Sequence, residues 1–209
     1  MTLFPVVMPV NIPSNGNHNS PYPSHLKRGS LNGPQKVDRL SLLAREALMV
    51  SAEKSGVRLK ELRQDKNGVP CPVDGIYWSL SHKSKYVAAV VSKNRVGIDI
   101  EEMKPRTESV FAYVAGDQEW ELADRSWDAF FRYWTAKEAA LKVVGIGIAG
   151  LKTCRVASVP DENHIVLDYK GQLFLIEHLR YDNHIVSVVK DDNQIEWVIL
   201  NTRQSTEVL

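Results

Sequence analysis

The sequence lacks most of the features that would indicate a secreted, membrane or nucleic-acid-binding protein. It has only two cysteines, Cys71 and Cys154, in 209 residues, and their spacing is not that of a metal site. A chain of this length needs no disulfide, so a reduced, cytoplasmic protein is expected. No apolar run is long enough to span a membrane, so we expect no membrane partner. The net charge is only +1, which argues against nucleic acid as a partner and means that any anion site must be local.

The N-terminal residues are apolar, but they do not have the pattern of a signal peptide. They contain Pro5 and Pro9 and no leading positive charge, so we expect a docked edge strand here. Residues 11–35 are rich in Asn, Ser, Pro and Gly, which predicts a loop with little regular structure.

Two segments have the apolar spacing of long helices. Residues 36–55 repeat apolar side chains every three or four positions up to Gly56, and residues 126–144 do the same up to Gly145. Residues 110–122 also favour a helix. Residues 86–92 and 95–101 alternate like strands, and we expect them to form a hairpin through Lys93 and Asn94. After residue 150 the sequence predicts a run of strands.

Three carboxylates stand out in this pattern. Asp99 and Glu101 lie two residues apart on an expected strand, so they share one face. Glu138 falls in the middle of the apolar stripe of the second long helix, where a carboxylate is costly unless it is paired. Lys142, one turn further on, would offset only about 0.3–0.5 kcal/mol of that cost. Three oxygen donors without a cysteine or histidine cluster suit a hard cation, and Mg²⁺ fits best.

Groups that could bind phosphate occur beside these acids. Ser81 and His82 follow an expected strand, and Lys83 and Lys142 add positive charge, so the set fits a diphosphate held between a metal and a cationic rim. Each feature alone also has a structural reading. Edge strands often carry charge, a lone histidine is usually structural, and Lys137 with Lys142 would normally be a solvated helix face.

Read together, three motifs resemble the 4′-phosphopantetheinyl transferase family of the Sfp type. They are WSLSH at 78–82, VGIDIE at 96–101 and WTAKEAALK at 134–142. The resemblance implies an α+β fold of two pseudo-twofold-related halves, residues 1–103 and 104–209, with the active site in the cleft between them. It implies Mg²⁺-dependent transfer of phosphopantetheine from coenzyme A to a serine of an apo acyl or peptidyl carrier protein of fatty acid, polyketide or nonribosomal peptide biosynthesis. The other product would be adenosine 3′,5′-bisphosphate.

The resemblance also implies a role for individual residues of this chain. It implies that three acids bind the metal and that basic or hydroxyl side chains contact the phosphates of coenzyme A. The metal ligands are Asp99, Glu101 and Glu138; the coenzyme A contacts are Ser81, His82, Lys142, Arg39 and Arg28 or its neighbour Lys27; the catalytic residues are Glu138, Lys142 and His82.

Two points stay open within this resemblance. The general base for the serine is Glu138, acting directly or through a water molecule, or else Glu119. The family often has lysine where this chain has Val69, so contacts to the nucleotide's 3′-phosphate would change, and Lys66 is a candidate substitute.

The resemblance further implies an acidic helical carrier protein as the partner. We expect docking at residues 105–122, aided by Lys104, Arg106, Arg125 or Arg132, although a solvated surface role is the simpler reading of each. A monomer is expected, because one chain supplies both sides of the cleft. Two other functions fit the same acids: a different metal-dependent phosphate enzyme, such as a phosphodiesterase or nuclease, and a carrier- or coenzyme A-binding protein without turnover.

Overall fold

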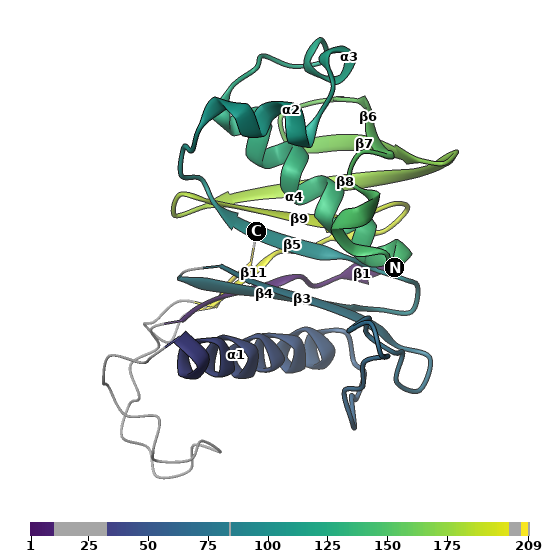
Figure 1. Cartoon of the computed structure of the whole chain (residues 1–209). Helices are drawn as coiled ribbons and strands as arrows, with labels where there is room; N and C mark the ends of the chain where they lie inside the picture. The colour runs from purple at the N-terminus through teal and green to yellow at the C-terminus, as the bar shows by residue number, and fades with distance from the viewer. Residues whose placement is uncertain (11–32, 84, 201–205, 209) are drawn as a thin grey trace.

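The structure is a computed structural model that describes residues 1–10, 33–83, 85–200 and 206–208 (Figure 1). Its helices and sheets confirm the predicted α+β class. Two five-stranded sheets lie face to face, with one long helix on the outer face of each (Figure 1). None of the helices in this part of the chain combines the length and the apolar character needed to cross a membrane.

The first layer pair consists of helix α1 and a sheet built mostly from the N-terminal part of the chain. Helix α1 is Gly33–Lys54, as the apolar spacing predicts. The strands follow the spatial order β12 (Thr206–Val208), β11 (Val198–Leu200), β2 (Val6–Pro9), β4 (Tyr86–Ser92) and β3 (Tyr77–Lys83). The core between helix and sheet includes Leu43, Leu48 and Val91, all buried.

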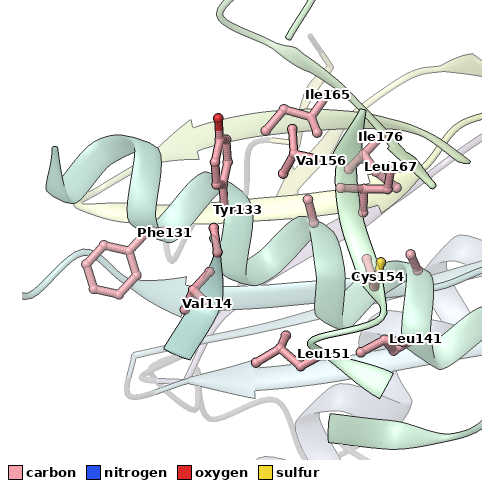
Figure 2. Close-up of a cluster of buried hydrophobic side chains, with 14 of the residues drawn as sticks. Val114, Phe131, Tyr133, Leu141, Leu151, Cys154, Val156, Ile165, Leu167 and Ile176 are labelled. Atoms are coloured by element: carbon pink, nitrogen blue, oxygen red, sulfur yellow. The ribbon is translucent and has the colours of Figure 1, made fainter. Parts of the chain in front are cut away.

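The second layer pair consists of helix α4 and the other sheet. Its strands follow the spatial order β5 (Ile98–Glu102), β9 (His184–Val189), β8 (Gln172–Tyr181), β7 (His164–Tyr169) and β6 (Cys154–Ser158). Helix α4 is Trp127–Val144, and it begins where the Ser126 hydroxyl accepts a hydrogen bond from the Ala129 amide. It ends at Gly145, which has the left-handed conformation (φ 80°) that favours glycine. Figure 2 shows side chains of the helix packed against those of this sheet.

Short elements complete the chain. They are the parallel pair β1 (Thr2–Leu3) and β10 (Gln194–Ile195), the 3₁₀ turns η1 (Glu108–Val110) and η2 (Gly147–Gly150), and the short helices α2 (Phe111–Val114) and α3 (Asp117–Trp120). The single helix predicted over 110–122 is therefore wrong. Gly116 takes an extended conformation (ψ 170°) between α2 and α3 and interrupts the helix there.

The predicted hairpin of residues 86–101 is also wrong. Strand β4 pairs with β2 and β3, whereas β5 pairs antiparallel with β9 of the other sheet. The reason is that two aliphatic side chains of β5 belong to the core between the two sheets. Ile98 and Ile100 pack on Ala88 and Val90 in the core between the sheets, so the strand lies over β4 and does not extend its ladder.

The predicted N-terminal edge strand lies inside its sheet. Strand β2 has β11 on one side and β4 on the other, and Val6, Val7 and Met8 are all buried. Because β11 and β12 come from the C-terminal end, distant parts of the chain build the first sheet together. The division into related halves at residue 103 stays a prediction.

Candidate active site

The candidate site lies where the free edges of the two sheets meet. Strand β3 ends the first sheet and β5 ends the second, and their side chains join across the gap. The Ser79 hydroxyl accepts a hydrogen bond from the Ile98 amide at 3.1 Å, and the Ser81 hydroxyl donates to Asp99 Oδ1 at 2.8 Å. The serines of WSLSH therefore fix the position of the VGIDIE strand.

Gly97 brings helix α4 against this strand. A Cβ atom at position 97 would collide with the carbonyl oxygen of Ala139 and lie 2.8 Å from its carbon. It would also lie 3.3 Å from the Cβ of Lys142. Only glycine permits this approach, so Gly97 sets the distance between the acids of β5 and the side chains of α4.

Asp99 and Glu101 are each paired with a lysine. Asp99 Oδ1 lies 2.9 Å from the Lys142 ammonium, which also donates to the Ile98 carbonyl oxygen at 2.8 Å. Glu101 Oε2 lies 2.7 Å from the Lys83 ammonium and 3.7 Å from the Arg106 guanidinium. Both carboxylates are largely shielded from solvent, with 9% and 13% of their side chains exposed.

Glu138 is the third acid of this group and has no such counter-ion. No hydrogen bond or ion pair to its carboxylate occurs within the described residues. Burial raises the pKa of Glu138, and the negative charges of Asp99 and Glu101 raise it further against the opposing effect of Lys142. The charges of the other two predicted metal ligands therefore act on Glu138, and no cation of the described residues forms an ion pair with it.

These residues fit a hard divalent cation in chemistry, although their present positions do not form a finished metal site. Three carboxylates suit Mg²⁺, and the uncompensated Glu138 is where a cation would be stabilising. As the side chains stand, however, the part of the chain that is described holds no group of three or more acids, histidines or cysteines close enough to hold an ion. A cation would have to compete with the lysines for Asp99 and Glu101.

His82 lies beside the same charges. Burial lowers the pKa of His82, the nearby Lys142 and Lys83 lower it too, and Asp99 partly opposes them. A neutral imidazole can offer one N–H donor to a phosphate oxygen. The structure therefore brings together five of the predicted site residues around Asp99: Ser81, His82, Glu101, Glu138 and Lys142.

A cavity of about 890 Å³ adjoins Lys142. The loop before β3 forms one wall, with Val69, Pro70 and Pro72, and the end of α4 with Gly145 to Gly147 forms the other. Tyr77, Trp78 and Arg95 also line it. Its volume is in the range of pockets that bind small organic ligands.

A smaller pocket of about 220 Å³ lies on the other side, at Glu101. Arg106, Tyr113 and Trp134 line it together with apolar residues of η1 and α4. Tyr113 is 46% exposed. The acids therefore stand between a large cavity and a small, mainly apolar pocket.

Several candidates lie elsewhere. Arg39 donates a hydrogen bond to the Val10 carbonyl oxygen at 3.1 Å, near the sheet end where β3 turns into β4. Arg28 and its alternative Lys27 lie outside the described residues. Lys66 is exposed and does not line the large cavity, whereas Val69 does.

Glu119 has a structural position. Its carboxylate accepts hydrogen bonds from the Gly116 and Val156 amides and pairs with the Lys137 ammonium at 2.6 Å. Lys137 is only 1% exposed, so its predicted place on a solvated helix face is wrong. Arg132 is buried too and donates to the Asp161 and His164 carbonyl oxygens, which removes it from any docking surface.

Sequence reasoning did not find the role of Gly97, although the residue stands inside a quoted motif. A glycine between two β-branched residues of a strand is a signal of close backbone approach. Which backbone approaches becomes evident only when α4 is in place.

Comparison with known proteins identifies relatives of this chain. A family model described as the 4′-phosphopantetheinyl transferase superfamily matches residues 95–192. The chain is 32% identical over 153 residues to a putative 4′-phosphopantetheinyl transferase of Haemophilus influenzae, which covers 68% of this chain and 64% of the relative. It is 36% identical over 96 residues to the 4′-phosphopantetheinyl transferase HetI of Nostoc, covering 42% and 40%. It is 34% identical over 122 residues to the 4′-phosphopantetheinyl transferase AcpT of Salmonella typhi, covering 54% and 62%. The chain thus spans less than two thirds of the length of each of these relatives.

Proposed function

The chain belongs to the 4′-phosphopantetheinyl transferase superfamily, and we propose that it transfers the 4′-phosphopantetheine arm of coenzyme A to a serine of an apo acyl or peptidyl carrier protein. One observation carries the proposal. The three motifs of the resemblance, which lie up to 64 residues apart in the sequence, contribute side chains to one group of charges between two pockets.

In this proposal Asp99, Glu101 and Glu138 hold Mg²⁺, which would supply positive charge to the diphosphate of coenzyme A. The raised pKa of Glu138 and its lack of a counter-ion among the described residues support the assignment. Lys142 and His82 donate to the phosphate oxygens and stabilise the charge that develops on them. Ser81 keeps Asp99 oriented through its hydroxyl.

The reaction is a displacement at phosphorus. The carrier serine oxygen forms a bond to the phosphorus that carries the pantetheine arm, and the bond from this phosphorus to the bridging oxygen breaks. Adenosine 3′,5′-bisphosphate leaves with that oxygen. Glu138 takes the serine proton, directly or through one water molecule. Glu119 is not our candidate for this step, because its carboxylate is already bonded to Lys137 and two backbone amides.

We assign the adenosine end of coenzyme A to the large cavity, because this cavity adjoins Lys142 and is lined by Tyr77 and Trp78. Arg95 and Lys142 are the two cationic residues in its lining. Arg39 and Arg28 stay proposed contacts to the nucleotide end, although Arg39 does not line this cavity and Arg28 lies outside the described residues.

We expect the carrier protein to approach from the opposite side, over residues 105–122. The small pocket there combines Arg106 with the exposed Tyr113, which suits an acidic partner with an apolar anchor. Arg125 and Lys104 stay candidates for the rim. A cytoplasmic monomer is part of the same proposal, and the two free cysteines agree with a reducing compartment.

Intact-mass spectrometry tests the proposal. An apo carrier protein is incubated with this chain, coenzyme A and Mg²⁺, and we expect its mass to rise by one phosphopantetheine group with release of adenosine 3′,5′-bisphosphate. Cleavage of coenzyme A without carrier would indicate a phosphodiesterase. Tight binding of coenzyme A or carrier without a mass change would indicate a binding protein.

A further inference from the structure

We propose that Lys83 binds a phosphate oxygen of the substrate, and that in the metal-free protein it is paired with Glu101 instead. The metal ion must displace Lys83 from this carboxylate before Lys83 can bind the substrate. The inference rests on the proposed function, because it concerns how the same site takes up its metal and the diphosphate of coenzyme A.

The Lys83 ammonium now occupies the position that a cation on Glu101 would need. It lies 2.7 Å from Oε2 and 3.1 Å from Oε1, so it covers both oxygens of the carboxylate. Only 13% of the Glu101 side chain is exposed, and the Arg106 guanidinium lies 3.7 Å from Oε2, which leaves little room for a further cation at the same oxygens. A metal ion cannot join Glu101 while this pair is intact, because two positive charges would meet there.

Lys83 is held less firmly than the other lysine of the site. Lys142 is anchored by Asp99 and by the carbonyl oxygens of Ile98 and Leu80. Among the described residues, Glu101 is the one partner of the Lys83 ammonium, and 34% of the Lys83 side chain is exposed. Lys83 is therefore released when it leaves one partner, Glu101, whereas Lys142 would have to leave three.

A released Lys83 stays beside the phosphate site. On β3 it shares a face with Ser81, which bonds Asp99, and its charge also acts on the His82 imidazole. An ammonium freed from a carboxylate gains from a phosphate oxygen close by. Metal binding and diphosphate binding would then be coupled: Glu101 would hold the metal, and Lys83 would pass from the carboxylate to the substrate.

This arrangement predicts opposite effects of Lys83 on the two ligands. Removing its charge should help a metal ion alone, since the nearer of the two cations at Glu101 is gone and only the Arg106 guanidinium, at 3.7 Å, is left. The same change should weaken coenzyme A in the presence of metal, since one phosphate contact is lost. A residue that merely supports the fold of the site would weaken both.

The test compares Lys83→Gln with Lys85→Gln. Lys85 is exposed and lies two residues away, so its replacement makes the same charge change without touching Glu101. Mn²⁺ binding without coenzyme A is measured by electron paramagnetic resonance of the free ion, and coenzyme A binding at saturating Mg²⁺ by calorimetry. We expect Lys83→Gln to bind Mn²⁺ about fivefold tighter and coenzyme A about tenfold more weakly, with Lys85→Gln equal to the unaltered protein.

Several results would overturn the inference. Mn²⁺ affinity that is unchanged or weaker in Lys83→Gln contradicts the competition at Glu101, and unchanged coenzyme A affinity contradicts the phosphate contact. If Lys85→Gln changed the Mn²⁺ and coenzyme A affinities as much as Lys83→Gln, both changes would follow from net charge alone. If the unaltered protein bound coenzyme A and Mn²⁺ but modified no carrier, the proposed function would fail while the role of Lys83 could still be measured.

Discussion

Replacing Gly97 with alanine should damage both stability and catalysis through one added methyl group. The φ angle of Gly97 is not positive, so alanine is compatible with the backbone conformation. The obstacle is the lack of space for the added methyl group. The new Cβ would collide with the carbonyl oxygen of Ala139, 2.8 Å from the carbonyl carbon, and both atoms belong to the helix backbone.

The size of the effect follows from what must move. A backbone carbonyl cannot rotate away as a side chain can, so α4 has to shift from β5 by about an ångström. Overpacking of this kind typically costs about 1–3 kcal/mol. The shift also moves Glu138 and Lys142 away from Asp99, and a misplacement of about 1 Å in an active site can cost about 100-fold in rate.

Urea unfolding and steady-state transfer kinetics measure the two effects. Gly116→Ala is the control for stability, because its Cβ would meet nothing nearer than Glu119 Oε2 at 3.9 Å, so we expect only the small loss from alanine as the N-cap of α3. Activity is compared at a temperature where Gly97→Ala is fully folded. A Gly97→Ala protein with the stability and the turnover number of the unaltered chain would refute the close approach of α4 to β5.

Four other changes test separate parts of the account. Glu138→Gln should abolish transfer without lowering the unfolding free energy at pH 7, because the raised pKa of Glu138 means that its charge destabilises the fold; a clear loss of stability would contradict this. His82→Ala should raise the KM for coenzyme A, and an unchanged KM would exclude its phosphate contact. Glu119→Gln should cost about 3 kcal/mol by leaving buried Lys137 without its counter-ion and with only the Val114 carbonyl oxygen among its described contacts, whereas lost activity at full stability would make Glu119 catalytic. Burial lowers the pKa of His178 well below its usual value, so the unfolded chain binds the proton first. The unfolding free energy should fall by up to about 1.4 kcal/mol per unit as the pH drops below about 6.5, and His178→Asn should remove this slope; an equal slope in the variant would contradict it.

The sequence predicts the long elements well because their signals are local. The apolar repeat of residues 36–55 and the Ser126 cap with the Gly145 end are properties of contiguous segments, and α1 and α4 are found there. The pairing of β5 is not a local property. Its aliphatic face fits any apolar surface, and its partner β9 lies more than 80 residues away.

The same difference between local signals and long-range contacts applies to the candidate site. The sequence predicts that Asp99, Glu101 and Glu138 belong to one site, and in the structure the charges of Asp99 and Glu101 act on Glu138. The ion pairs that neutralise Glu101 and Glu119 could not be predicted from the sequence. Lys83 with Glu101 joins β3 to β5, and Glu119 with Lys137 joins α3 to α4, so each pair depends on how separate elements pack and not on the periodicity of one element.

The most direct test of the central claim is a crystal structure of the protein with coenzyme A and Mg²⁺. The account predicts a metal ion bound by Asp99, Glu101 and Glu138, the diphosphate lying across it, and the adenosine in the cavity beside Tyr77 and Trp78. Coenzyme A bound elsewhere, or the two lysines still paired with Asp99 and Glu101 and no metal between the acids, would contradict it.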